Sequence, residues 1–99
     1  MATAVDREIR RHLLRFVHDA RDGEEFSRVV HQQLITYGHR ITWQEFDRHL
    51  TYLERAGCVQ GRFLRPAVDR SRQLKITQKG IDVLEGSVQE PGVMPPDEI

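Results

Sequence analysis

Residues 42–64 read TWQEFDRHLTYLERAGCVQGRFL, and they are the most informative part of the chain because they hold a complete helix and the start of a strand. Thr42 and Glu45 have the spacing of a capping box, in which the hydroxyl and the carboxylate each accept a backbone amide at a helix N-terminus. Apolar side chains then recur every three or four residues, which predicts one buried face. Gly57 is suited to end the helix. The inward residues should be Phe46, His49 or Leu50, Leu53 and Ala56.

A pair of strands and a last short helix are predicted to follow. Residues 58–64 alternate loosely between apolar and polar side chains, and residues 73–76 resume the alternation after a polar, turn-like segment at 66–72. The two segments pair most simply as an antiparallel hairpin. Thr77 is placed to cap a helix over residues 77–85.

Two more amphipathic helices are predicted before this stretch. The first spans residues 6–20, with Asp6 accepting free amides of the first turn and an Asp22-Gly23 turn after its end. The second spans residues 24–37, because two glutamates at its start complement the positive end of a helix dipole. Its predicted inner face consists of Phe26, Val29, Val30 and Leu34.

The composition of the C-terminus predicts one domain followed by a tail. Residues 87–99 contain three acids and three prolines without apolar periodicity, so we expect a flexible acidic tail behind a domain at residues 1–86. The only cysteine, Cys58, excludes an intrachain disulfide and is expected to be a small buried side chain. We find neither a signal peptide nor an apolar run of about 20 residues, so we expect a cytoplasmic protein without membrane contact.

The charges are unevenly distributed although 15 basic and 15 acidic residues cancel. Residues 1–57 carry nine of each sign. Residues 58–80 carry six basic residues against one acid, and residues 81–99 carry five acids and no base. The predicted hairpin is therefore the cationic part of a chain whose net charge is zero.

This order of elements, and two motifs within it, resemble winged helix-turn-helix domains. The stretch Leu50-Thr51-Tyr52-Leu53-Glu54-Arg55-Ala56-Gly57-Cys58-Val59 resembles the L-x-x-L-x-x-x-G-x-V junction between recognition helix and wing in many bacterial members. Residues 74–84 resemble their L-x-I-T-x-x-G-x-x-x-L return from the wing to the last helix. The ending at residues 76–86, followed by Pro91-Gly92-Val93, is similar to small winged-helix proteins of Mu-like prophages. The resemblance implies an α+β fold with a three-helix core, a two-stranded antiparallel wing and a short C-terminal helix.

The capped helix and the hairpin supply the candidate DNA contacts. Arginine and glutamine side chains pair with guanine and adenine edges in the major groove, and clustered cations on a hairpin suit phosphates. The resemblance implies a transcription regulator that places the helix in the major groove of double-stranded DNA and the wing on the backbone. The candidate contacts are Gln44, Arg48, Thr51 and Arg55 on the helix, and Arg62, Arg65, Arg70, Arg72 and Lys75 on the wing.

Other readings of these residues stay open. The outward face of the helix also carries Asp47, which weakens the attraction for phosphate, so a protein-interaction adaptor is the alternative function. Charges on an exposed hairpin also serve simply to discourage aggregation. Winged-helix proteins dimerise through the first helix as well, so a homodimer is a further alternative.

We predict neither catalysis nor a cofactor. The five histidines form no His–His pair at the i,i+4 spacing of a helical metal site, and Cys58 has no second thiol nearby in the sequence. The glycines are dispersed at predicted turns rather than gathered in a phosphate-binding loop. No metal site is therefore expected.

Overall fold

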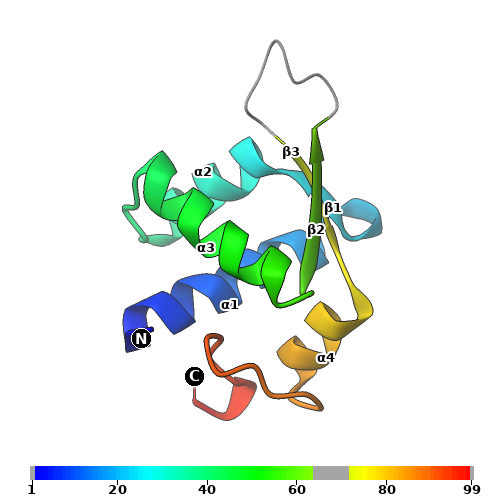
Figure 1. Cartoon of the computed structure of the whole chain (residues 1–99). Coiled ribbons are helices and arrows are strands. Elements are labelled where there is room, and N and C mark those ends of the chain that lie inside the picture. Colours follow the sequence, from blue (N-terminus) through cyan, green and yellow to red (C-terminus); the bar gives the residue numbers. More distant parts are fainter. Residues whose placement is uncertain (1, 64–71, 99) are drawn as a thin grey trace.

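The computed structural model describes residues 2–63 and 72–98, which form four helices and a three-stranded antiparallel sheet (Figure 1). This part of the chain is an α+β fold, as predicted. Each of its helices is too short or too polar to cross a lipid bilayer. The main elements are α1 (Ala4–Asp19), β1 (Glu24–Phe26), α2 (Ser27–Tyr37), α3 (Trp43–Arg55), β2 (Val59–Phe63), β3 (Arg72–Ile76) and α4 (Gln78–Glu85).

The predicted caps of α3 and α4 are confirmed. The amide of Glu45 donates to the Thr42 hydroxyl at 3.1 Å, and the amide of Thr42 donates to the Glu45 carboxylate at 3.0 Å. The Thr77 hydroxyl accepts the amide of Gly80 at 3.1 Å. In α1 the N-cap is Thr3 rather than Asp6, because Asp6 is the acidic partner in a second capping box.

Strand β1 corrects the prediction of a helix that begins at Glu24. Residues 24–26 pair antiparallel with β3, which lies between β1 and β2 in the sheet, and the Glu24 carboxylate lies 3.9 Å from the Lys75 ammonium. Because α2 then begins at Ser27, Phe26 and Val29 are 46% and 38% exposed instead of buried. The two-stranded sheet that we predicted is therefore extended by a strand from far upstream.

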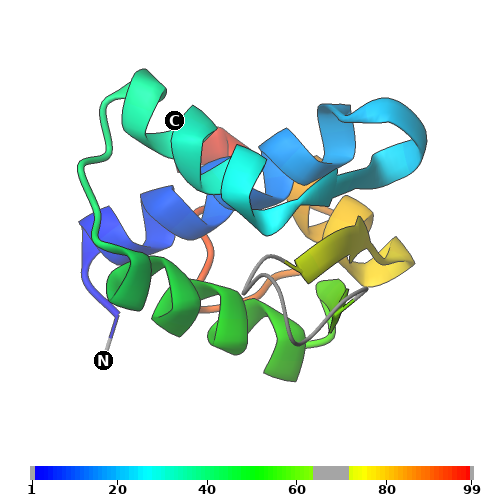
Figure 2. The same ribbon diagram turned by 90° about the horizontal axis from the view of Figure 1, so that it is seen from above.

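The hydrophobic core lies around α1. Helices α2 and α3 both pack on α1, and Figure 2 shows them flanking it in the view from above. Cys58 is fully buried, as predicted, and burial raises the pKa of its thiol. The largest fully buried side chains are Phe46, Leu13, Leu14, Leu34, Leu50, Leu53, Leu74, His49, Val17, Val30, Val59 and Val93.

Residues 87–98, the segment predicted as a tail, lie against α1 (Figure 1). Val93 is buried, and the amide of Met94 donates to the carbonyl of Arg7 at 3.1 Å. The Arg11 guanidinium donates to the carbonyls of Met94 at 3.2 Å and Leu84 at 3.1 Å. Composition did not reveal this because the donors that hold the segment come from arginines in α1.

Candidate nucleic-acid interface

The four candidate residues of α3 lie on one exposed face of that helix. Gln44, Arg48, Thr51 and Arg55 follow one another at intervals of three or four residues and together line an open depression of about 730 Å³. Gln44, Arg48 and Arg55 are exposed and Thr51 is half-buried. The four side chains therefore share one open face, which they line together with Asp47, Tyr52 and Glu90.

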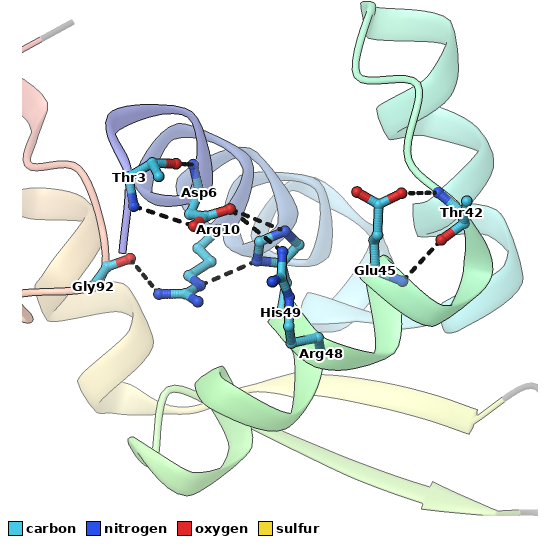
Figure 3. A network of polar contacts seen from close by, with 8 residues as sticks. All are labelled: Thr3, Asp6, Arg10, Thr42, Glu45, Arg48, His49 and Gly92. Carbon is cyan, nitrogen blue, oxygen red and sulfur yellow. Dashed lines mark hydrogen bonds and ion pairs between the residues drawn. The ribbon is translucent and has the colours of Figure 1, made fainter. Parts of the chain in front are cut away.

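A polar network beneath this face joins α3 to the start of α1 (Figure 3). One carboxylate oxygen of Asp6 closes the capping box with the amide of Thr3 at 3.1 Å. The other oxygen lies 3.6 Å from the Arg48 guanidinium and 3.8 Å from His49 Nε2. The hydrogen bond with the Thr3 backbone, assisted by these two side chains, lowers the pKa of Asp6. A single carboxylate thus caps α1 and positions the start of the α3 surface.

His49 is the buried centre of this network. Its side chain is only 1% exposed, and its Nδ1 accepts a hydrogen bond from the Arg10 Nε at 3.2 Å. Burial, together with the positive charges of Arg10 and Arg48, lowers the pKa of His49 to about 4. The imidazole is therefore neutral at pH 7, and its accepting nitrogen fixes the Arg10 side chain.

Tyr52 connects α3 to the C-terminal segment. The Arg10 guanidinium lies 4.0 Å from the centre of the Tyr52 ring, and Arg10 also donates to the carbonyl of Gly92 at 3.3 Å. The Tyr52 hydroxyl donates to the Glu90 carboxylate at 2.6 Å and accepts the amide of Gly92 at 3.0 Å. Burial raises the pKa of Tyr52, and the hydrogen bond to Glu90 raises it further.

Replacing Tyr52 by phenylalanine should reduce the free energy of unfolding by about 1–2 kcal/mol, because the half-buried Glu90 carboxylate and the Gly92 amide would both lose a partner. Urea denaturation followed by circular dichroism measures the change. Tyr37→Phe is the matched control, since that side chain is exposed, and it should change the free energy by less than about 0.5 kcal/mol. Equal effects of the two substitutions would show that the contacts of Tyr52 contribute little.

The described cations of the hairpin differ in their surroundings. Arg62 is exposed and donates to the Gln73 amide oxygen at 3.2 Å, and Lys75 is exposed on the neighbouring strand. Arg72 instead turns toward α3, where it forms an ion pair with Glu54 at 2.7 Å and lies 4.0 Å from Asp47. Its side chain is only 18% exposed, and because it lies beside these two carboxylates its charge partly compensates theirs.

Two candidate residues, Arg65 and Arg70, lie outside the described residues. The remaining seven divide into the α3 group and the β2–β3 group, which the Arg72–Glu54 ion pair joins. DNA contact by these residues stays a prediction. The supporting network of Asp6, Arg10 and Tyr52 was missed because its members are far apart in the sequence; the Thr3–Asp6 spacing was the only local signal.

A second polar cluster lies on the other side of α1. The carboxylate of Glu8 and ring nitrogens of His12 and His39 all lie within 4.8 Å of one another. The sequence holds no His–His pair at the i,i+4 spacing, whereas this group combines a Glu–His pair at i,i+4 with a histidine from the connector after α2. Burial lowers the pKa of His12, and the proximity of His39 lowers it further.

Comparisons of the chain with protein-family models, with curated proteins and with solved structures gave no match.

Proposed function

We propose that this chain is a winged helix-turn-helix protein that binds double-stranded DNA and regulates transcription. In this proposal α2 and α3 form the helix-turn-helix, α3 enters the major groove, and the β2–β3 hairpin is the wing that contacts the phosphate backbone. The observation that carries the proposal is the polar face of α3, where Gln44, Arg48, Thr51 and Arg55 line one open surface next to a cationic hairpin.

The side chains on this face have the chemistry for reading bases. Arginine donates two hydrogen bonds to guanine, and glutamine pairs with adenine through one donor and one acceptor. Arg48 is 62% exposed even though it is near Asp6, so its guanidinium is accessible to a base edge or a phosphate. The capping box at Thr42 and Glu45 satisfies free backbone amides at the N-terminus of α3, the helix that carries these side chains.

The ion pairs of Arg72 also bear on the balance of charge at this surface. The acids of α3 would repel phosphate if their charges were uncompensated. Arg72 lies close to both Glu54 and Asp47, which reduces that repulsion at the cost of one wing cation. Arg48 and Arg55 on the helix, with Arg62 and Lys75 on the strands, are then the described cations that would meet DNA.

Fluorescence anisotropy with labelled duplex DNA tests the proposal. We expect the affinity to fall steeply as the salt concentration rises, because each neutralised phosphate releases counterions. Arg48→Ala and Arg55→Ala should each weaken binding about five- to tenfold, and loss of a phosphate contact should reduce the salt slope by about one. Arg15→Ala is the matched control, since Arg15 is an exposed arginine on α1 that pairs with Asp19.

Two results would contradict DNA binding at this surface. One is an affinity that is absent at low salt or insensitive to salt. The other is an equal loss of affinity in Arg48→Ala and in the Arg15→Ala control.

A protein-interaction adaptor is the alternative function, and an apolar surface between α1 and α2 favours it. Phe16, Val29 and Tyr37 contribute to an open depression of about 710 Å³, and the latter two side chains are among the exposed large apolar residues. Such a surface also suits the homodimer that the sequence left open, which light scattering would detect. An amide-shift titration with DNA separates the functions. Shifts confined to residues 44–55 and the hairpin favour DNA binding, and their absence favours the adaptor.

A further inference from the structure

Three potential metal ligands converge where α1 meets the connector between α2 and α3. Glu8 and His12 are four residues apart in α1, so they project from the same side of the helix. His39 comes from the connector, and its Nε2 lies 2.8 Å from the Nδ1 of His12. The carboxylate of Glu8 completes a set whose ligand atoms are all within 4.8 Å of one another.

The backbone after α2 fixes the position of His39. Gly38 has a φ of 127°, a conformation that L side chains rarely adopt, and it turns the chain back toward α1. The amide of His39 donates to the carbonyl of Leu34 at 2.9 Å, and the carbonyl of His39 accepts the amide of Ile41 at 3.0 Å. These contacts are independent of the His39 side chain, so they present its ring to α1 without help from a ligand.

Tyr37 holds both imidazole rings from one side. Its ring centre lies 4.4 Å from that of His12 and 5.5 Å from that of His39, which it stacks against. The two histidines are therefore packed by an aromatic neighbour while their facing nitrogens point toward each other. Restricting the rings in this way lowers the entropy that is lost when a ligand binds between them.

We propose that Glu8, His12 and His39 bind a divalent transition-metal cation, with zinc as the expected ion. Two imidazole nitrogens and one carboxylate are a ligand set that zinc accepts, with water in the fourth position. At 2.8 Å the two facing nitrogens are within hydrogen-bond distance, so without a cation one of them has to carry a proton and donate it to the other. A cation would replace that proton and satisfy both nitrogens at once.

The required movements are small. With zinc–nitrogen bonds of about 2.0–2.1 Å, two nitrogens in a tetrahedral site are roughly 3.3 Å apart. The His12 and His39 nitrogens would therefore separate by about half an ångström from their present 2.8 Å. A rotamer change of the long Glu8 side chain would bring its carboxylate to the same centre. The bound cation would tie α1 to the connector that leads into α3.

Isothermal titration of the metal-free 99-residue chain with zinc chloride tests the proposal. We expect one zinc ion per chain. His12→Gln, His39→Gln and Glu8→Gln should each weaken the affinity at least about tenfold. His18→Gln is the matched control, because His18 is also in α1 but lies beside Asp19, outside the cluster. The affinity of this control should stay within about twofold of the unmodified chain.

A second measurement uses the unmodified protein and so does not depend on how the variants fold. Paramagnetic Co²⁺ should broaden or shift the ring signals of His12 and His39 strongly in NMR spectra, and affect those of His18 far less. Zinc should also raise the midpoint of thermal unfolding in the unmodified chain but not in His12→Gln. Absence of stoichiometric zinc binding, or an unchanged affinity in His12→Gln and His39→Gln, would overturn the proposal. Neither outcome bears on DNA binding.

Discussion

Replacing Gly80 by alanine should reduce the free energy of unfolding by about 2–3 kcal/mol, because Cys58 and Ile76 leave no room for a methyl group at this position of α4. A Cβ atom built on Gly80 would overlap the backbone carbonyl oxygen of Cys58 and lie 2.8 Å from a side-chain carbon of Ile76. That carbonyl also accepts the amide of Thr77 at 3.1 Å. Relief of the clash would therefore require α4 to move away from the start of β2 and the end of β3.

Helix propensity alone predicts the opposite sign for this substitution. Alanine is more favourable than glycine inside a helix by about 1 kcal/mol. The steric argument is contradicted if Gly80→Ala is as stable as the unmodified protein or more stable, as measured by urea denaturation. Gln78→Ala is the control in the same helix, because Gln78 is exposed, and it should change the free energy by less than about 0.5 kcal/mol.

Local sequence signals predicted the elements whose causes are local. The capping box at Thr42 and Glu45 places the start of α3, and Thr77 places the start of α4, because each signal consists of side chains within three residues of the backbone groups that they satisfy. The outward face of α3 was predicted for the same reason, since the helical period relates Gln44, Arg48 and Thr51 directly.

Features that depend on distant partners were not predicted. Residues 24–26 form a strand because β3 supplies hydrogen-bonding partners about fifty positions later, and two glutamates before an apolar run look locally like a helix start. The C-terminal segment packs on α1, where Arg10 and Arg11 donate to the carbonyls of Gly92 and Met94. Composition describes the segment itself but not the donors that it meets.

The candidate site also combines features with local causes, which were predicted, and features with distant partners, which were not. Periodicity predicted which residues of α3 face outward, but not that Arg72 would pair with Glu54 and Asp47 across the strand–helix junction. Nor did it predict that His49, one of two alternatives for an inward position, would be buried together with Leu50. These contacts depend on distances in the folded structure rather than on separations in the sequence, and those distances follow from how α1, α3 and β3 pack.

The stability of the domain should fall by up to roughly 3 kcal/mol as the pH is lowered from about 6.5 to about 4, because in that range His49 is protonated in the unfolded chain but stays neutral in the folded one. The unfolded chain binds a proton at this histidine near pH 6.5, whereas burial and the charge of Arg10 lower the folded pKa to about 4. Between these values the unfolded state binds more protons, so acid favours unfolding. Above pH 6.5 the contribution is fully present.

His49→Gln separates this titration from other effects of acid. The glutamine amide oxygen can still accept the Arg10 hydrogen bond, but it does not titrate, so the loss of stability between pH 6.5 and 4 should be much shallower. His12 also has a lowered pKa and contributes in the same direction, and His12→Gln removes that part of the dependence. Urea midpoints at several pH values measure both slopes. An equal loss of stability in the unmodified chain and in His49→Gln would mean that protonation of the buried imidazole does not cause the acid sensitivity. The contact between Arg10 and His49 would then not depend on a neutral ring.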